Sequence, residues 1–292
     1  MRRAAVAVQG VSEPSAPECE TVDQPASSAI KPAPATPVAA APRDASPASL
    51  FGGPASVPLH LAVETKPNAS APVPRLSREE AQRRLDALRR RYEQDAPHQH
   101  FVTDHHSIVF GEGDAAARLM FIGEAPGAEE DRTGRPFVGR AGQLLEKMLG
   151  AMGLKREQVY ITNVLKTRPP NNATPTMEEA SLCAPYLYEQ VAIIRPEVIV
   201  TLGLPATRVV LNTADSMTRL RGRWSAFTPP PTALSGQFGD GPRLSVPVMP
   251  TYHPAFLLRS YTTENRQKVW SDLCMVLERL GINPPAKRPT AG

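Results

Sequence analysis

The 292-residue chain has few cysteines and no long apolar run, and each deficit excludes a class of protein. Its three cysteines, Cys19, Cys183 and Cys274, show no metal-ligand spacing. An odd, sparse set argues against a disulfide scaffold and indicates a reducing compartment. No apolar stretch approaches the roughly 20 residues of a membrane-spanning helix. The apolar residues 4–8 are too few for the core of a secretion signal, which takes about 7–15 residues. We therefore expect a cytoplasmic protein without a membrane anchor.

Aromatic residues make up only 5% of the chain, and its N-terminal part has almost none. Thirteen of the 32 prolines fall within the first 75 residues, mixed with alanine and serine. Such a segment buries too little apolar surface to offset the entropy cost of ordering it. We expect a disordered tail over residues 1–76, one folded domain over 77–283 and a disordered end over 284–292. The long tail either recruits an unknown partner or is a solvated segment with no specific task.

The charge balance is mildly basic, with a net charge of +4 that lies entirely outside the first 75 residues. This balance is compatible with nucleic-acid binding, but many soluble enzymes share it. A histidine cluster, His98, His100, His105 and His106, could bind a metal ion. Its spacing fits no known metal-binding frame and no thiolate stands nearby, so a solvated loop is favoured.

Short apolar runs alternate with helical periodicity through the rest of the chain. We expect strands near residues 119–122, 159–162, 198–202 and 246–250. Capping boxes at Ser77-Arg78-Glu79-Glu80 and Thr176-Met177-Glu178-Glu179 predict two helix starts. Strands that alternate with helices predict an α/β fold, a three-layer α/β/α sandwich around a central four-stranded parallel sheet.

Two later segments have distinctive patterns. Arg219, Arg221 and Arg223 alternate within residues 218–227, which is typical of a strand with a basic edge. Residues 229–241 are rich in proline and glycine and are expected to form a mobile insertion.

The stretch from Gly123 to Arg140, GEAPGAEEDRTGRPFVGR, carries the strongest functional signal. It lies between a predicted strand and a predicted helix, so we expect a long loop at the carboxyl end of a strand. Ligands of α/β proteins bind at such ends. Asn163 and His253 follow two other predicted strands. Because the carboxyl ends of parallel strands share one rim, we expect these three segments to form one site.

At these residues the chain resembles the uracil-DNA glycosylase superfamily, and above all its family-4 type, the bacterial and archaeal iron–sulfur enzymes. The resemblance covers residues 77–281, with several motifs in the same order. They are Gly123-Glu124-Ala125-Pro126-Gly127 with the following Glu-Asp-x-Thr-Gly-Arg-Pro-Phe-Val-Gly, then Asn163, Lys166-x-Arg168-Pro169-Pro170, Arg221-Gly222 and His253-Pro254-x-x-Leu257-Leu258-Arg259. The resemblance implies an enzyme that flips uracil out of DNA and hydrolyses its glycosidic bond.

One departure from the family concerns the cofactor. Family-4 enzymes hold a 4Fe–4S cluster with four cysteines, and here three of these positions are Ala96, Gln99 and Thr167. Only Cys183 remains. Because one thiolate cannot hold a cluster that needs four, we predict no iron–sulfur centre and no other cofactor or metal. Another branch links covalently to DNA through a histidine in an inserted basic loop, and no such insertion follows Arg168.

The resemblance implies that Asn163, Phe137, Gly123 and Ala125 bind the base. The Asn163 amide offers a donor and an acceptor that match the O4 and N3–H edge of uracil, whereas cytosine presents the opposite pattern. Phe137 offers a flat face on which the flipped base can stack. Ala125 stands where other branches carry a water-activating aspartate. A turn cap for Asn163 and a core position for Phe137 are the structural alternatives.

Catalysis is assigned to His253, Glu130 and Glu124. A neutral His253 would donate an N–H to uracil O2 as negative charge grows on the leaving base. Glu130 would position water or stabilise the sugar cation. Glu124 would orient the loop. The structural alternative for His253 is a histidine satisfied within the fold.

The expected DNA contacts come from five residues, Lys166, Arg168, Arg221, Leu258 and Arg259. The basic side chains would grip phosphates, and the Leu-Leu-Arg segment would enter the minor groove as a wedge. The expected partner is uracil-containing DNA, single- or double-stranded, bound by a monomer at the nucleoid.

Three functions are compared. The first is a uracil-DNA glycosylase. The second is a binding module that kept the pocket but lost turnover. The third is a phosphate-ester enzyme that uses the glycine-rich loop, which lacks the lysine of a phosphate-binding loop. Asn163, Phe137 and His253 favour the first function over the second.

Overall fold

The computed structural model describes residues 75–230 and 244–283. The expected disorder over residues 1–74 and 284–292, and most of the expected insertion over 229–241, lie outside the described residues. Arg75, just inside the expected tail, donates to the carbonyls of Ala116 and Ala117 at 2.7 Å each. The contacts of the folded domain therefore begin no later than Arg75.

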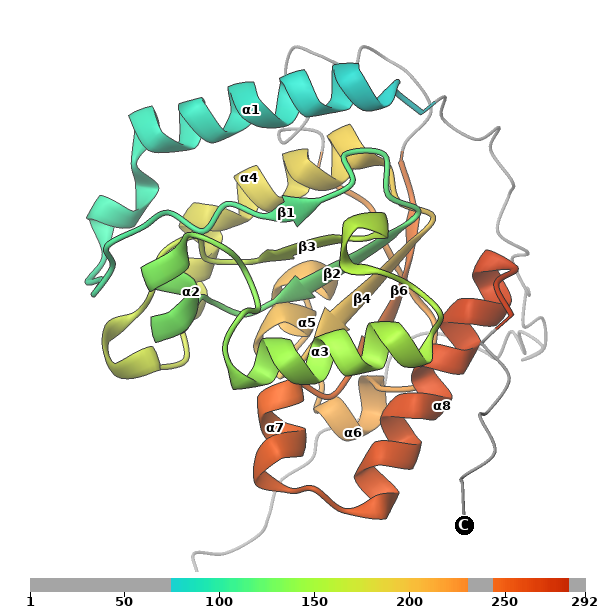
Figure 1. Cartoon of the computed structure of the whole chain (residues 1–292). Coiled ribbons are helices and arrows are strands. Elements are labelled where there is room, and N and C mark those ends of the chain that lie inside the picture. The colour runs from blue at the N-terminus through green and yellow to red at the C-terminus, as the bar shows by residue number, and fades with distance from the viewer. Residues whose placement is uncertain (1–74, 231–243, 284–292) are drawn as a thin grey trace, which may run out of the picture. The chain divides into compact units, whose positions relative to one another are not determined.

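Six strands of the described residues form one mixed sheet in the order β1-β3-β2-β4-β6-β5 (Figure 1). They are β1 (Glu112–Gly113), β2 (Leu119–Gly123), β3 (Tyr160–Asn163), β4 (Val198–Leu202), β5 (Ser225–Phe227) and β6 (Val246–Thr251). The four central strands are parallel, and β1 and β5 pair antiparallel at the two edges. The predicted four-stranded parallel sheet is confirmed, with one short strand added on each side.

Helices connect the strands and cover both faces of the sheet. The α-helices are α1 (Arg78–Asp95), α2 (Ala128–Thr133), α3 (Arg140–Ala151), α4 (Met177–Ile194), α5 (Leu204–Leu211), α6 (Met217–Leu220), α7 (Pro254–Arg259) and α8 (Thr263–Leu280). Within the described residues, three short 3-10 helices are η1 (Pro97–His100), η2 (Arg156–Gln158) and η3 (Pro170–Asn172). In the part of the chain that is described, no helix combines the length and the apolar character needed to cross a membrane.

The alternation of side chains along β2 divides the core in two. Met120 and Ile122 belong to a cluster with residues of α1, α4 and α5, whereas Leu119 and Phe121 belong to a cluster with residues of α3 and α8. Figure 1 shows α1 and α4 on one side of the sheet and α3 and α8 on the other. The three-layer α/β/α sandwich is therefore confirmed.

Local signals place most of the helix ends. The Ser77 hydroxyl accepts from the Glu80 backbone N–H at the start of α1, and Thr176 accepts from Glu179 at the start of α4. Both predicted capping positions are confirmed. A hydroxyl at such a position satisfies one of the backbone N–H groups that a helix start leaves without a partner.

Two predictions of local structure are wrong. Residues 218–227 do not form one basic edge strand, because α6 occupies its beginning and only β5 is extended. The Arg221 side chain turns inward to a buried Asp272, which alternation in sequence cannot reveal. The long loop over residues 123–140 also contains a helix, α2, whose start at Gly127 is capped by the Glu130 carboxylate.

Candidate active site

A cleft of about 630 Å³ opens at the carboxyl ends of the parallel strands. Segments that follow β2, β3, β4 and β6 line it, namely residues 124–127, Asn163, Gly203 and residues 252–253. The three segments predicted to converge therefore do so, because parallel strands bring their carboxyl ends to one rim.

Asn163 ends β3 with its side chain buried in the wall of the cleft. Its amide oxygen Oδ1 has no hydrogen-bond partner among the described residues. A buried polar atom without a partner costs about 1–3 kcal/mol, so this acceptor is suited to a donor brought by a ligand. A Cβ on Gly123 would lie 2.3 Å from Oδ1, so glycine is required beside the amide.

Phe137 is held in a backbone conformation that bulky residues rarely adopt. Its φ angle is 51°, in the left-handed region, a conformation that costs of order 1–3 kcal/mol and persists only where the surroundings impose it. Its ring centroid lies 5.6 Å from that of His253 with the planes tilted by 35°, and a Cβ on Gly123 would lie 2.5 Å from the ring. The strained backbone therefore places an aromatic face in the wall that also holds Asn163.

His253 is held in one tautomer by its neighbours. Its Nδ1 accepts from the backbone N–H of Ala255 at 3.1 Å, so the neutral ring carries its proton on Nε2. Burial, together with the positive charge of Arg259, lowers the pKa of His253 to about 4. At neutral pH this residue is therefore an uncharged imidazole that can donate from Nε2.

The Glu130 carboxylate braces the loop. Its Oε1 accepts from the backbone N–H groups of Val138 and Gly139, both at 2.8 Å, and Oε2 accepts from Gly127 at 3.1 Å. These bonds cap the starts of α2 and α3. The structure thus gives Glu130 the loop-orienting task that the sequence assigned to Glu124.

Glu124 is a second acid of the cleft, which Glu130 also lines. Burial raises the pKa of the Glu124 carboxyl above the usual range, against a hydrogen bond with Thr174 and the charge of Arg259. Acids with raised pKa values in clefts are typical of proton-transfer groups. Ala125 follows it and also lines the cleft, without a functional group of its own.

Lys166 cannot grip a phosphate in this structure, so its predicted DNA contact is wrong. The side chain is fully buried, and Nζ donates to Thr162 Oγ1 at 2.8 Å and to Asn163 O and Gln190 Oε1 at 2.7 Å each. The three acceptors match the three protons of an ammonium group. Lys166 therefore ties α4 to the end of β3, directly beneath Asn163.

This burial predicts an unusual pH dependence of stability. Desolvation lowers the pKa of Lys166 to about 7, well below that of an unfolded lysine. The unfolded chain then binds more protons between pH 7 and about 10.5, so the free energy of unfolding should rise with pH in that window, by up to about 1.4 kcal/mol per unit. Urea unfolding of Cys183→Ala and of Cys183→Ala/Lys166→Met at several pH values measures the difference, because the titration of Cys183 is coupled to that of Lys166 and is absent from both proteins. Parallel curves would contradict the assignment.

Two of the predicted phosphate-binding arginines already have acidic or amide partners. Arg168 donates to Asn172 Oδ1 at 2.8 Å, and its Nη1 lies 3.4 Å from Asp104 Oδ2. Arg221 donates to Asp272 Oδ1 at 2.6 Å. Neither residue lines the cleft. Their main observed contacts hold the arginine-proline loop and α8 in place.

Helix α7 carries two further predicted DNA contacts, Leu258 and Arg259, of which Arg259 lines the cleft. Arg259 is exposed and lines the cleft. Leu258 is half-buried, whereas its neighbour Leu257 is only 3% exposed and belongs to the core. Of the two leucines in the motif, Leu258 is therefore the one available for insertion into DNA.

Sequence reasoning missed two aromatic residues of the cleft, Tyr252 and Phe256. Their ring centroids lie 4.8 Å apart and both residues line the cleft. Tyr252 comes one position before His253 and Phe256 three positions after it. Their closeness to the His-Pro motif in the sequence is the feature that could have indicated them.

Cys183, which the resemblance places among the ligands of a 4Fe–4S cluster, lies in a packed part of the core. Cys183 is fully buried, and its Sγ lies 3.9 Å from the hydroxyl of Tyr92, which is itself fully buried. The Tyr92 ring packs against His98 at 5.6 Å, Phe110 at 6.0 Å and Tyr186 at 5.0 Å between centroids. We call Tyr92, His98, Phe110 and Tyr186 the aromatic cluster.

The donors required by an iron–sulfur centre are not present at this place. Burial raises the pKa of the Cys183 thiol, which opposes the thiolate form that binds metals. Thr167 is buried and Gln99 exposed, and neither is a thiolate. In residues 75–230 and 244–283 no group of three histidine, cysteine or acidic side chains could hold a metal ion. The residues therefore do not fit the cluster of the family-4 type.

The histidine segment is only partly solvated, which corrects the expectation of a solvated loop. His98 is 7% exposed within the aromatic cluster, and the ring of His105 lies 4.8 Å from it. The His106 ring, by contrast, is largely exposed, with Nδ1 at 2.9 Å from Asp131 Oδ2.

Comparisons with known proteins agree with this geometry. The family described as the uracil DNA glycosylase superfamily matches residues 110–274. A type-4 uracil-DNA glycosylase of Thermotoga maritima is 45% identical over 168 residues, which is 57% of this chain and 80% of the relative. A type-4 uracil-DNA glycosylase of Archaeoglobus fulgidus is 42% identical over 183 residues, which is 61% of this chain and 85% of the relative. A type-5 uracil-DNA glycosylase of Pyrobaculum aerophilum is 39% identical over 121 residues, which is 36% of this chain and 53% of the relative. The chain belongs to the uracil-DNA glycosylase superfamily.

Proposed function

We propose that this protein is a DNA-repair enzyme that removes uracil from DNA by hydrolysing its glycosidic bond. The observation that carries the proposal is one cleft wall that combines the unpartnered Oδ1 of Asn163, the ring of Phe137 and the imidazole of His253. These groups supply an amide edge, a stacking face and a donor, which a flipped uracil requires.

Asn163 selects the base. Its Oδ1 accepts the N3–H of uracil and its amide N–H donates to O4. Cytosine has an acceptor at N3 and a donor at the exocyclic amine, so it would leave both groups mismatched. Phe137 stacks on the ring of the flipped base, a contact that contributes about 1–3 kcal/mol.

Bond cleavage separates charge, and both products of that separation are stabilised. As the bond between N1 and C1′ breaks, the electron pair moves to the uracil ring, and Nε2–H of His253 donates to O2. A water molecule attacks C1′ and gives its proton to Glu124, whose raised pKa suits a general base. Glu130 acts indirectly, through the loop that it holds.

The reaction ends at the abasic site. The residues that line the described cleft include no lysine, the amine that strand-cleaving lyases use to form a Schiff base with the sugar. The enzyme is therefore monofunctional in this proposal.

DNA is gripped at the rim of the cleft. Leu258 enters the duplex where the base leaves, and exposed Arg259 contacts a phosphate beside it. The protein acts as a monomer on single- or double-stranded DNA in the cytoplasm, at the nucleoid.

The enzyme works without metal in this proposal, and the purified protein should be colourless and free of stoichiometric iron. The physical reason is the single buried thiol and the aromatic cluster that packs against it. Iron and acid-labile sulfide assays check this, with chelator treatment as a rate control. Cys183→Ala is the matched variant and should retain uracil release. A visible charge-transfer band with stoichiometric iron would contradict the proposal.

A uracil-containing oligonucleotide tests the function directly. Incubation, alkali treatment and gel separation should show cleavage at the uracil position, and the same sequence with cytosine should stay intact. A binding module would instead retain the uracil oligonucleotide tightly and leave it uncut, and this outcome would replace the enzyme proposal.

A further inference from the structure

The strained backbone of Phe137 is held from outside the cleft by Arg156. Arg156 Nη1 donates to the Phe137 carbonyl at 3.1 Å, and Nη2 donates to the carbonyl of Pro136. A planar guanidinium can bind two adjacent carbonyls at once because its N–H groups have a fixed fork geometry.

The same carbonyl is confined on its other side by helix α3. A Cβ placed on Gly142 would lie 1.9 Å from the Phe137 carbonyl oxygen. The Phe137 peptide is thus held between a helix backbone and a guanidinium. Its φ of 51° is imposed by these surroundings.

Arg156 is itself fixed by acids. Its Nε donates to Glu112 at 3.1 Å and its Nη1 lies 3.3 Å from Glu146, and the side chain is 11% exposed. Arg156 starts η2, which leads into β3 and Asn163, and Glu112 lies on β1, the neighbouring strand. The support of Phe137 is therefore built on the strand that carries the base-reading amide.

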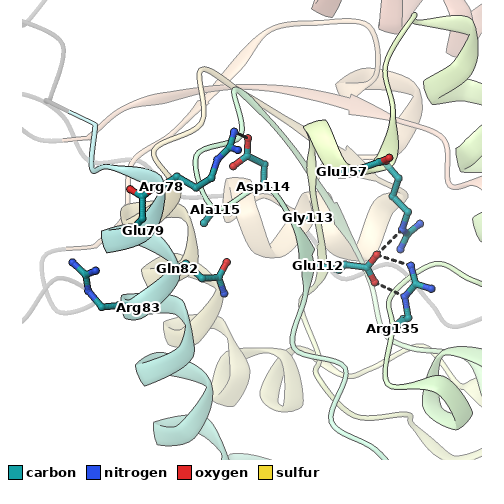
Figure 2. Close-up of a pocket in the computed structure, with 11 residues that line it drawn as sticks. Arg78, Glu79, Gln82, Arg83, Glu112, Gly113, Asp114, Ala115, Arg135 and Glu157 are labelled. Atoms are coloured by element: carbon teal, nitrogen blue, oxygen red, sulfur yellow. Dashed lines mark hydrogen bonds and ion pairs between the residues drawn. The ribbon is translucent and has the colours of Figure 1, made fainter.

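Glu112 also binds a second arginine, Arg135, whose hydrogen bonds in the described part of the chain go to Glu112 alone. Figure 2 shows Arg135 facing Glu112 in a charged pocket of about 930 Å³ that is separate from the cleft. Arg135 donates twice to Glu112 at 2.7 Å. These bonds hold the pKa of Glu112 below its usual range, so the carboxylate is ionised. Arg135 and Arg156 thus share Glu112 as a partner, but of these two arginines it is Arg156 that donates to the Phe137 carbonyl.

We infer that Arg156 is a positioning residue for base capture: through the carbonyls of Pro136 and Phe137 it fixes the ring on which the flipped uracil stacks. This inference rests on the stacking role proposed for Phe137. Without the guanidinium, the Phe137 peptide relaxes toward the common region of φ, and its ring leaves the face opposite His253.

The test compares Arg156→Gln with Arg135→Gln. Arg135→Gln also removes a guanidinium from Glu112 but leaves both carbonyl contacts in place. Single-turnover rates are measured across enzyme concentration on a uracil oligonucleotide with 2-aminopurine beside the uracil, whose fluorescence reports base flipping. Arg156→Lys and Gly142→Ala are the additional variants. The lysine keeps the charge but not the fork, and the alanine displaces the same carbonyl from the other side.

We expect Arg156→Gln to raise the enzyme concentration at half-saturation, and to lower the equilibrium for base flipping, by roughly 5- to 160-fold, which corresponds to the loss of one base–aromatic stack. Affinity for DNA without uracil should stay at the parent value, as should every constant of Arg135→Gln. Gly142→Ala should reproduce the defect, and Arg156→Lys should restore only part of it.

Other results would overturn the inference. If Arg156→Gln only lowers the melting temperature or the fraction of active enzyme, Arg156 is structural. If it fails to fold, Arg156→Lys and Gly142→Ala decide, and parent-like flipping in both rejects the role. If the parent protein leaves the uracil oligonucleotide uncut, the proposed function itself is rejected. If the parent cuts the oligonucleotide and Arg156→Gln flips and cuts it equally well, only the present inference is rejected.

Discussion

Asn163→Asp should lower the single-turnover rate of uracil release by on the order of 10⁴-fold, because a site built to hydrogen-bond its substrate leaves buried groups unpaired when one partner changes. The side chain is 1% exposed and lies against Gly123 and Phe137, so it cannot turn away from the base. An ionised carboxylate only accepts, so it repels O4 of uracil and favours the exocyclic amine of cytosine. A trace of cytosine release is therefore the accompanying expectation.

Asn172→Asp is the matched control for this prediction. Asn172 lines the same cleft but is exposed, and its Oδ1 accepts from Arg168, a bond that a carboxylate preserves. Its rate should stay near that of the parent. Uracil release by Asn163→Asp at the parent rate would show that another group reads the base.

His253→Ala should slow uracil release by about 100- to 1000-fold, equivalent to roughly 2.7–4 kcal/mol, because one preorganised donor to the leaving anion is lost. Affinity for uncleaved uracil DNA should change little, since the charge on the base develops only in the transition state. Because the pKa of His253 is about 4, the parent rate should show no titration of this imidazole near neutral pH.

Two further substitutions separate catalysis from helix capping. His253 accepts from the Ala255 N–H at the start of α7, so alanine also removes a cap. His253→Asn offers an acceptor for that cap but no donor at the place of Nε2, and it should remain slow. His253→Gln carries a longer amide that reaches toward the base and should recover part of the rate. Parent-like turnover by His253→Asn would disprove the donor role.

Much of the fold could be predicted because its signals are local. The capping hydroxyls of Ser77 and Thr176 bond to N–H groups three residues away. Apolar runs identified the four central strands, and parallel topology alone then required their following loops to meet. The meeting of residues 124–127, Asn163 and His253 in one cleft therefore followed from order along the chain.

Long-range partners decided what the sequence by itself could not. Lys166 was expected at the DNA, but Gln190, 24 positions away, and the β3 carbonyl bury it. Arg221 turned inward to Asp272, 51 positions away. The sequence does not distinguish a basic residue at the surface from one in the core. Only packing determines whether a protein acceptor or water completes the hydrogen bonds of that residue.

The chain by itself determined the layered α/β architecture and the order of the motifs. Only the tertiary structure decided that the Glu130 carboxylate binds the backbone of the loop, that Glu124 and Glu130 both line the cleft, and that Tyr92 packs against Cys183. The physical reason is that strand and helix signals depend on spacing between neighbours in the sequence. The task of a charged or aromatic side chain depends on which distant groups the completed fold brings within hydrogen-bond or packing distance.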